Sequence, residues 1–434
     1  MTSPDWHPPA ASGPLDATVT LPGSKSLTNR YLVLAALASG TSRLRRPLRS
    51  RDTDLMAQAL RELGAGVDDA TSSTNALASP DWLITPASLR GGGRIDCGLA
   101  GTVMRFLPPV AALARGDVSF DGDEHARVRP MAAVLDALRD LGVAIDDDGR
   151  GTLPFVVHGQ GAVKGGTVVV DASASSQFVS ALLLAGPRFE EGITVVHDGK
   201  PVPSLPHIEM TVETLRDAGA EVDDSEANTW RVEPGELLPL DVTVEPDLSN
   251  AAPFLAAAVV AGGSVTVTDW PQHTTQAGDQ IREVLDQMGA EVRLDARTLT
   301  VTGDGRPHGV DIDLSDAAEL TPVVAALAAC ATGPSIIRGV GHIRGHETNR
   351  IAALATELTA IGAEVTERED GLRIDPGPPR PATFRTYADH RMVMAAGVLS
   401  LAVPGLVIED PATVGKTLPD FTTLWESMIG TSAG

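Results

Sequence analysis

LRELGAGVDD at Leu60–Asp69 returns as LRDLGVAIDD at Leu138–Asp147 and as LRDAGAEVDD at Leu215–Asp224, and related endings begin at Leu285 and Leu358. Each copy closes an apolar, helix-like segment. Self-similarity at a spacing of about 70–76 residues is the signature of a repeat architecture. The sequence therefore predicts six α/β units, the sixth cut short near the C-terminus.

Each unit begins with a polar loop, followed by an Ala-rich apolar helix, a glycine that we expect to end the helix, and a β-rich segment. Helix N-termini carry free N–H groups and a partial positive charge, so they favour bound anions. If the units pack symmetrically, several such ends should converge on anionic small molecules. The six loops are PGSKSLTNR, GLAGTVMR, SASSQF, EPDLSNA, DAAELTP and YADHR, and the six glycines are Gly40, Gly116, Gly192, Gly263, Gly333 and Gly405.

Composition limits the partners. A net charge of −23 over 434 residues disfavours nucleic acid and anionic membrane surfaces, because phosphate binding needs a basic footprint. The apolar helices are shorter than the ~20 residues that span a bilayer. No secretory signal is recognisable, so Met1–Pro14 is expected to be a loose leader. Cys97 and Cys330 lack metal-ligand spacing and favour a reducing cytoplasm.

Six units divide into two domains of three. The predicted bounds are 23–243 for the N-terminal domain and 1–22 plus 244–434 for the C-terminal domain. The strand within ATVTLPG, which precedes the first helix, is expected to close the truncated sixth unit. The chain then crosses twice, near Pro22–Gly23 and near Val242–Glu245. Paired crossings predict a hinge, with the active site in the cleft between the domains.

The loops carry charges that ordinary capping explains only in part. Lys25 and Arg30 lie at a helix start that Ser24 or Ser26 can cap, and cations there oppose the helix dipole unless an anion offsets them. Solvent-facing charge is the alternative for these residues and for Arg129. A local surface ion pair is the alternative for Glu347 and Arg350, which are three residues apart.

These motifs give the chain a close resemblance to the 5-enolpyruvylshikimate-3-phosphate (EPSP) synthase family, from about Ala17 to Met428. PGSKSLTNR, LAGTVMR, ASSQF, ETNR, ADHRM and GKTLPDF occur in the family's order. The resemblance implies a two-domain α/β enolpyruvyl transferase fold. In that fold six βαβαββ repeats lie three per domain, as an inside-out α/β barrel.

The resemblance also implies an activity. The family transfers the enolpyruvyl group of phosphoenolpyruvate to the 5-hydroxyl of shikimate 3-phosphate and releases phosphate, by addition and elimination through a tetrahedral intermediate. This is a step of the shikimate pathway to chorismate and the aromatic amino acids, and it is the target of glyphosate. No metal and no organic cofactor is implied. We expect a cytoplasmic monomer whose partners are these two small molecules.

Site residues carry over by motif. The catalytic candidates are Glu319 as base, with Lys25 and Glu347 as alternative proton donors. The residues expected to bind shikimate 3-phosphate are Lys25, Ser26, Arg30, Ser175, Ser176, Gln177, Ser204, Glu319 and His346. The residues expected to bind phosphoenolpyruvate are Lys25, Gly101, Arg129, Gln177, Arg350, Arg391 and Lys416.

The chain departs from the family pattern at several of these positions. Glu319 stands where the family usually has Asp, which adds one methylene to the reach of the base. Leu99 and Phe106 flank Gly101 where Asn and Pro are frequent, so the response to glyphosate does not follow. Three histidines replace other residues: His207 stands for Tyr, His342 for Asn and His346 for Lys.

Three alternatives are weighed against this function. The sister enolpyruvyl transferase that acts on UDP-N-acetylglucosamine carries a reactive Cys before its Arg-Pro pair, and DEHARVRPM at Asp123–Met131 has none. A nucleotide- or RNA-end-processing enzyme is opposed by the acidity and by an aromatic content of 3%. A non-catalytic repeat scaffold would not concentrate acids, amides and guanidinium groups at one end of each unit.

Overall fold

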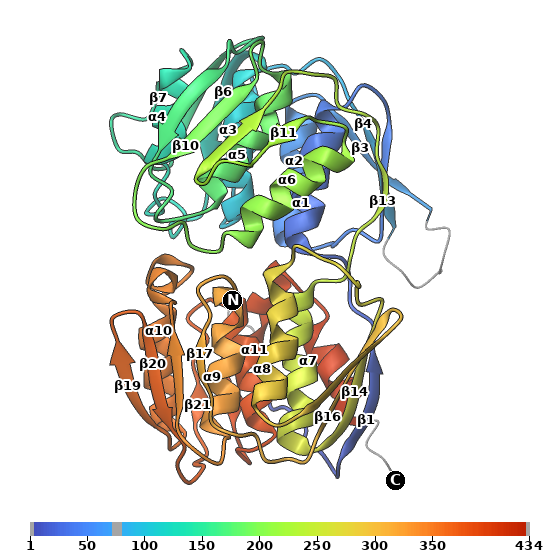
Figure 1. The fold of residues 1–434 in the computed structure, drawn as a ribbon, viewed down its shortest axis with the longest axis vertical. Coiled ribbons are helices and arrows are strands. Elements are labelled where there is room, and N and C mark those ends of the chain that lie inside the picture. Colours follow the sequence, from blue (N-terminus) through green and yellow to red (C-terminus); the bar gives the residue numbers. More distant parts are fainter. Residues whose placement is uncertain (1–3, 72–79, 431–434) are drawn as a thin grey trace. The chain divides into compact units, whose positions relative to one another are not determined.

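The computed structural model describes residues 4–71 and 80–430. By its internal contacts the chain divides into two units. We call Gly23–Val244 the N-terminal unit and Met1–Pro22 with Glu245–Gly434 the C-terminal unit. Figure 1 colours them along the sequence, and each is described by itself.

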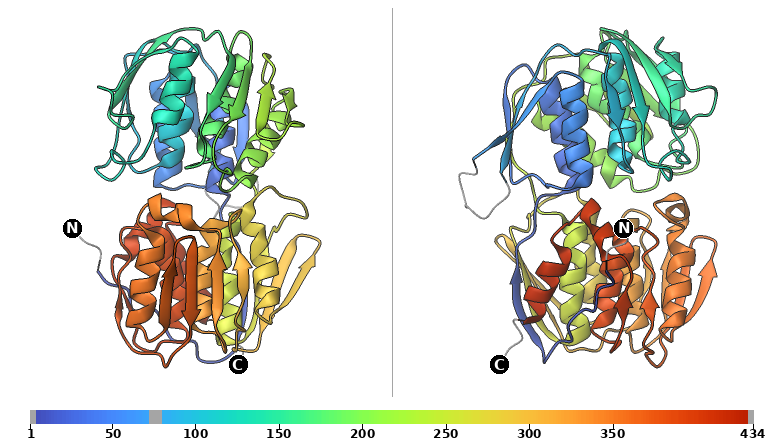
Figure 2. Two further views of the ribbon diagram at one scale, coloured as in Figure 1. Left: turned by 60° about the vertical axis from the view of Figure 1, so that its left-hand side comes forward. Right: turned by 180° about the vertical axis from the view of Figure 1, so that it is seen from behind.

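Three four-stranded sheets form the outside of the N-terminal unit (Figures 1 and 2). They run β13-β2-β4-β3, β5-β6-β8-β7 and β9-β10-β12-β11, and each joins one parallel pair to two antiparallel strands. The strands are β2 (Ser42–Arg45), β3 (Gly66–Ala70), β4 (Asp81–Thr85), β5 (Arg94–Asp96), β6 (Arg115–Asp121), β7 (Ala144–Asp146), β8 (Phe155–Gln160), β9 (Gly166–Val170), β10 (Ile193–His197), β11 (Val222–Asp223), β12 (Thr229–Val232) and β13 (Asp241–Thr243).

The first helix of each repeat lies in the core of this unit. Helices α1 (Lys25–Leu37), α3 (Gly101–Ala112) and α5 (Gln177–Ala185) are almost wholly buried, and they are mostly apolar beyond their first turns, as buried helices must be. A short 3-10 helix, η1 (Gly186–Arg188), extends α5. The second helices bury one face only and are α2 (Arg51–Glu62), α4 (Ala132–Asp140) and α6 (Pro206–Asp217).

The C-terminal unit repeats this plan with two four-stranded sheets, β1-β14-β16-β15 and β17-β18-β20-β19, and the pair β21-β22. Its buried helices are α7 (Leu248–Ala261), α9 (Thr321–Ala329) and α11 (His390–Ser400). The outer helices are α8 (Ile281–Gln287), α10 (Arg350–Ala360) and α12 (Phe421–Gly430), with 3-10 helices η2 (Ala277–Gln280), η3 (Ala318–Leu320), η4 (Gly341–Gly345) and η5 (Pro411–Lys416). The strands are β1 (Leu15–Val19), β14 (Gly263–Thr268), β15 (Glu291–Asp295), β16 (Thr298–Gly303), β17 (Asp311–Asp313), β18 (Ser335–Arg338), β19 (Glu364–Arg368), β20 (Gly371–Asp375), β21 (Thr383–Phe384) and β22 (Val407–Ile408).

The N-terminal strand does not join the sixth repeat, so that prediction is wrong. β1 pairs in parallel with β14 of the fourth repeat, in register from Leu15–Gly263 to Val19–Val267. Every second residue of β1 is buried, which suits an edge strand with one face on the core.

The part of the expected leader that the structure describes, residues 4–14, is more ordered than expected, and residues 1–3 lie outside the described residues. Trp6 forms an antiparallel bridge with Ile408 in β22, which places it in the sixth repeat. Its ring is 8% exposed and its Nε1 donates a hydrogen bond of 2.9 Å to Glu426. A buried indole with a satisfied N–H fixes this segment.

The two chain crossings exchange strands between the repeats. β1 immediately precedes α1 but belongs to the sheet of the fourth repeat, while β13 immediately precedes α7 but pairs with β2 of the first repeat. Each unit therefore has its first sheet completed by the strand that leads into the other unit's first helix.

The six repeated glycines lie two to five residues beyond the last helical residue rather than at the cap. Gly116, Gly192, Gly263 and Gly405 have φ between +65° and +107°. Their conformational freedom serves the turn into the next strand, not the helix end.

Candidate active site

The N-termini of α1, α3 and α5 come together within the N-terminal unit. Ser24 caps α1, its Oγ accepting from the Leu27 amide at 3.5 Å. Asn29 Nδ2 on α1 donates to Thr102 Oγ1 on α3 at 2.7 Å, and Arg105 Nη1 on α3 donates to Gln177 Oε1 on α5 at 3.0 Å. These bonds tie the three helix starts to one another, as the sequence predicted.

Gly101 is the point at which the side chains of this region meet. A Cβ atom added there would lie 2.7 Å from Arg105 Nη1, 3.2 Å from Arg129 Nη2 and 3.2 Å from Gln177 Oε1. Two guanidinium groups and an amide thus converge on a backbone that carries no side chain. We call Lys25, Asp52, Gly101, Arg105, Arg129 and Gln177 the N-terminal cluster.

Lys25, the first residue of α1, faces a carboxylate from α2. Its Nζ lies 3.4 Å from Asp52 Oδ2, and Asp52 is 1% exposed. A buried carboxylate needs a charged or hydrogen-bonding partner. Asp52 therefore holds the ammonium group near the start of α1 and α3.

Arg30 is bonded to protein groups rather than turned outward. Its guanidinium donates to Thr211 Oγ1 at 2.8 Å, to the His207 carbonyl at 2.8 Å and to the Ser26 carbonyl at 3.0 Å. Burial lowers its pKa to about 9. These bonds show it linking α1 to α6, and its contact with a substrate stays a prediction.

Three of the predicted serines lie at the starts of α5 and α6. Ser176 is the N-cap residue of α5 and is buried, and Ser175 Oγ accepts from the Gln177 amide at 3.3 Å. Ser204 precedes α6 with φ +53°, in the left-handed region that non-glycine residues rarely adopt. One serine hydroxyl is thus used within the turn at α5.

A second group surrounds Arg350 at the start of α10. Its Nε donates to Asp389 Oδ2 at 2.7 Å and its Nη2 to Glu347 Oε2 at 2.9 Å. The predicted ion pair between Glu347 and Arg350 is present, but the two side chains are only 10% and 4% exposed, so it is not a surface pair. Burial opposes the charge, yet Asp389 and Glu347 raise the pKa of Arg350 above its ordinary value.

Glu347 is shared between two cations. Lys416, at the end of η5, donates its Nζ to Glu347 Oε1, while Arg350 occupies Oε2. His346 Nδ1 lies 3.1 Å from Arg350 Nη1. The predicted residues His346, Glu347, Arg350 and Lys416 are therefore linked in one chain of contacts through Arg350 and Glu347.

Arg391 enters from α11. Its Nη2 donates to Ser249 Oγ at 2.7 Å, and Ser249 in turn donates to Asp247, the N-cap of α7, at 2.8 Å. Burial lowers the pKa of Arg391, an effect that Asp247 and Glu319 oppose. Starts of α7, α10 and α11 thus contribute to the same region.

Glu319 lies in η3, directly before α9, and is partly buried. Its charge acts on Arg350, Arg391 and His342, which places it beside the two arginines. Burial lowers the pKa of His342, and Arg350 adds to this while Glu319 opposes it. We call this set the C-terminal cluster; it consists of Asp247, Ser249, Glu319, His342, His346, Glu347, Arg350, Asp389, Arg391 and Lys416.

Several members of the clusters were not predicted. Asp52 and Asp389 stand at helix starts, where an acid is expected for capping alone. Arg105 belongs to the quoted motif LAGTVMR and Ser249 to EPDLSNA, so their motifs were recognised without their roles. The sequence did not indicate the roles of these residues because each contacts a partner that lies far away along the chain.

No group of three or more His, Cys, Asp or Glu side chains suited to a metal ion occurs in residues 4–71 and 80–430. Within the same residues, no helix is both long and apolar enough to cross a membrane.

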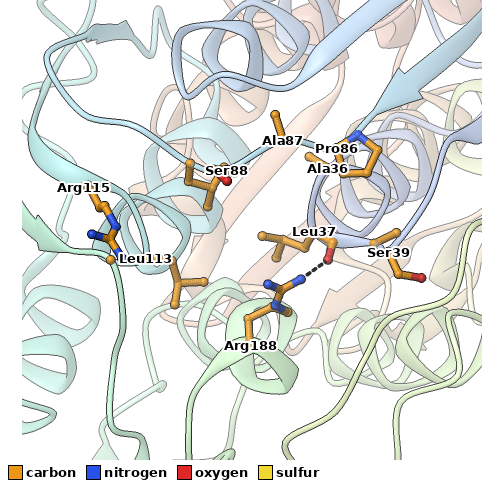
Figure 3. A pocket seen from close by; sticks show the side chains of 12 residues that line it. Ala36, Leu37, Ser39, Pro86, Ala87, Ser88, Leu113, Arg115 and Arg188 are labelled. Carbon is orange, nitrogen blue, oxygen red and sulfur yellow. Dashed lines mark hydrogen bonds between the residues drawn. The ribbon is translucent and has the colours of Figure 1, made fainter.

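A cavity of about 460 Å³ opens at the other ends of the core helices of the N-terminal unit (Figure 3). It includes Leu37, Leu113 and Arg188, whose Nη1 donates to the Leu37 carbonyl at 2.7 Å. Helix C-termini carry partial negative charge and disfavour anions. The cavity contains none of the predicted site residues, and we assign it no ligand.

Enolpyruvyl transferases of known structure share this fold. EPSP synthase from Acinetobacter baumannii is 25% identical, with a TM-score of 0.79, and the match covers 98% of this chain and 97% of that one. The enolpyruvyl transferase NikO from Streptomyces tendae is 21% identical, with a TM-score of 0.74 and 96% of each chain covered, a likeness that concerns the fold alone. The fold is therefore that of the enolpyruvyl transferases, as predicted.

Sequence comparison narrows this class. The model of the EPSP synthase (3-phosphoshikimate 1-carboxyvinyltransferase) family matches residues 9–425. The 3-phosphoshikimate 1-carboxyvinyltransferase of Kocuria rhizophila is 56% identical over 431 residues, which cover 98% of this chain and 96% of the relative. The chain belongs to the EPSP synthase family, and the predicted resemblance is confirmed.

Proposed function

We propose that the two clusters together carry out the family's reaction. In it the enolpyruvyl group passes from phosphoenolpyruvate to the 5-hydroxyl of shikimate 3-phosphate. The observation that carries the proposal is the convergence of Arg350, Arg391 and Lys416 with Glu319 and Glu347 in one unit. Three cations suit a substrate with a carboxylate and a phosphate, and two carboxylates suit proton transfer.

Binding of phosphoenolpyruvate falls to the cations of both clusters. Arg129 and Lys25 of the N-terminal unit, with the open backbone at Gly101, complement Arg350, Arg391 and Lys416. Guanidinium groups pair bidentately with carboxylate and phosphate, and each charge-assisted bond contributes about 1.5–3 kcal/mol. Holding both anions together removes translational freedom from the chemical step.

Shikimate 3-phosphate is assigned to the polar helix starts of the N-terminal unit. Ser26, Ser175, Ser176 and Ser204 offer hydroxyls, and Gln177 lies beside Gly101, which we assign to phosphoenolpyruvate. Hydroxyl and amide groups at helix N-termini suit phosphate and ring oxygens. Arg30 then has two proposed roles: it holds α1 against α6 through its hydrogen bonds, and it is a candidate ligand of shikimate 3-phosphate.

The reaction begins when the 5-hydroxyl oxygen attacks C2 of phosphoenolpyruvate. Glu319 takes the hydroxyl proton, while C3 gains a proton from Lys25 or Glu347, which gives a tetrahedral ketal. Loss of a proton from C3 and departure of phosphate then form the new enol ether. The two steps balance in atoms and charge with no metal or organic cofactor. Lys25 and Glu347 are both candidates for the group that protonates C3.

The decisive measurement is phosphate release from phosphoenolpyruvate and shikimate 3-phosphate, with each substrate omitted in turn. UDP-N-acetylglucosamine serves as a parallel acceptor. Release that depends on shikimate 3-phosphate supports the proposal, and release only with the sugar nucleotide would overturn the acceptor.

Two substitutions then test the roles. Glu319→Gln should depress turnover far more than the affinity for shikimate 3-phosphate. Arg129→Ala should mainly weaken the binding of phosphoenolpyruvate, and an unchanged affinity would remove that assignment.

We also propose that the enzyme acts in the cytoplasm as a monomer, in which residues 23–243 form one domain and residues 1–22 plus 244–434 form another, and that the domains close on substrate. Two free cysteines suit a reducing compartment. Light scattering after size exclusion tests the monomer, and small-angle scattering with and without both substrates tests closure.

A further inference from the structure

A buried carboxylate holds the chain that leads into α11. Glu357, on α10, is 3% exposed. Its Oε2 accepts a hydrogen bond from the Arg385 amide at 3.0 Å, and its Oε1 accepts from Tyr387 Oη at 2.6 Å. A carboxylate removed from water is tolerated only with such partners. Both bonds fall on the four residues before the N-cap of α11.

These residues form a turn that their sequence does not favour. Tyr387 and Ala388 both have φ +54°, in the left-handed region that non-glycine residues rarely adopt. Thr386 is buried, and its carbonyl accepts from the Asp389 amide at 2.9 Å. Strained conformations of this kind persist where the surroundings impose them. The two bonds of Glu357 hold Arg385 and Tyr387 within this turn.

The turn ends on the residue that organises the C-terminal cluster. Asp389 caps α11, its Oδ1 accepting from the Arg391 amide at 2.9 Å, and its two oxygens hold the guanidinium of Arg350. The orientation of both arginines therefore depends on where the turn places Asp389 and the start of α11.

We propose that Glu357 and Tyr387 are positioning residues for phosphoenolpyruvate, acting through this turn on Asp389, Arg350 and Arg391. The inference rests on the proposed function of those arginines and adds two residues to it. Neither positioning residue acts on a reacting atom. Their effect is to hold the turn in the conformation that aims the two guanidinium groups.

The protonation state of Tyr387 keeps its hydrogen bond to Glu357 in place over the neutral pH range. Although Tyr387 is 37% exposed, desolvation of its phenol together with the bond to Glu357 raises its pKa to about 12. Of the other charges near the phenol, Glu409 adds to the shift and Arg385 opposes it. The hydroxyl therefore keeps its proton through the neutral range and stays a donor to Glu357.

Tyr387→Phe and Glu357→Gln test the proposal without removing bulk. Either change should raise KM for phosphoenolpyruvate by about tenfold, the effect of losing one hydrogen bond to a charged group. KM for shikimate 3-phosphate should stay within about twofold. Tyr387→Phe removes the hydrogen bond to Glu357, and Glu357→Gln removes the charge that strengthens the same bond, so the double variant should be little worse than the more severe single one.

Asp147→Asn is the matched control. Asp147 is also a buried carboxylate that braces a turn, accepting from the Gly149 amide at 3.0 Å and the Gly151 amide at 2.8 Å, next to the left-handed Asp148. It belongs to the other unit and to neither cluster. Its loss should lower the melting temperature and leave KM for phosphoenolpyruvate unchanged. If the Tyr387 and Glu357 variants behave in the same way, their role is only structural and the proposal is overturned.

Hydrogen exchange supplies a readout that does not depend on turnover. The amides of residues 385–391 should exchange faster in Tyr387→Phe than in the unaltered protein, and unchanged exchange would also overturn the proposal. If the unaltered protein releases no phosphate, the proposed function fails instead, and the exchange result still decides whether Tyr387 holds the turn.

Discussion

Asp389→Asn isolates the charge of the residue on which the C-terminal cluster depends. Asn keeps the size of Asp389 and one oxygen to cap α11, so the change removes the negative charge without opening a cavity. The carboxylate is fully buried and lies 2.7 Å and 3.2 Å from two nitrogens of Arg350, which is itself 3% exposed. The substitution therefore leaves a buried guanidinium short of one counter-ion.

The expected cost follows from that burial. Breaking a buried ion pair by removing one partner costs about 3–5 kcal/mol, because the remaining charge is uncompensated. Glu347 still bonds Arg350 at 2.9 Å, so we expect the lower end, about 3 kcal/mol. For a unit of this size, that loss lowers the melting temperature by about 6–12 °C.

Calorimetry can resolve this effect because the change lies in one unit only. The transition of the C-terminal unit should move down, and that of the N-terminal unit should not. Asp311→Asn is the control: Asp311 pairs with Arg338 at 2.7 Å, but the side chains are 53% and 45% exposed, so its loss should stay within about 0.5 kcal/mol. A loss below about 1 kcal/mol for Asp389→Asn would refute the reasoning, since buried and exposed pairs would then be equivalent.

Three further predictions follow from single sites. Gly101→Ala places a Cβ 2.7 Å from Arg105 Nη1, the end of a flexible side chain, so the fold should persist while steady-state kinetics show KM for phosphoenolpyruvate raised by about tenfold or more. Burial lowers the pKa of His342, so protonation favours the unfolded chain and stability falls as the pH drops through the folded-state pKa; His342→Gln should flatten that fall in urea unfolding. Burial also raises the pKa of the Cys97 thiol, and titration with a thiol reagent should find it unreactive until the protein unfolds.

The repeat and the core helices could be predicted from the sequence because each depends on residues that lie close together along the chain. The endings at Leu60, Leu138 and Leu215 recur at a nearly constant spacing, and the Ala-rich segments are mostly apolar. Burial of such helices follows from composition alone. Ser24 as the cap of α1 was predictable for the same reason, since a cap is a contact over three residues.

Partners far apart in the chain were harder to predict. Leu15, Ala17 and Val19 alternate with exposed residues as in any half-buried strand, and the pattern does not say which sheet receives them. Only the register with Gly263–Val267 distinguishes the fourth repeat from the sixth. Trp6 gave a clearer signal, because a lone indole in a polar leader is better explained by burial than by solvent.

The same limit applies to the candidate site. Lys25 and Arg391 were found because family motifs mark them, whereas their partners lie elsewhere in the chain: Asp52 for Lys25 and Ser249 for Arg391. An acidic residue at a helix start is expected there because it stabilises the helix N-terminus. A second role as the counter-ion of a distant cation therefore leaves no further signal in the sequence.

The carboxylates Asp389 and Glu347 affect how an anionic substrate can bind to the cations of the C-terminal cluster. Arg350 is bonded to Asp389 and Glu347, and Lys416 to Glu347. If phosphoenolpyruvate binds as proposed, its carboxylate and phosphate compete with these side chains for the same donors. Asp389 is tied to the start of α11 and cannot withdraw without loss of the cap, whereas Glu347 lies outside the regular part of α10. Glu347 is therefore the carboxylate best placed to exchange its partners when substrate binds, which is the behaviour that a group moving a proton during the reaction requires.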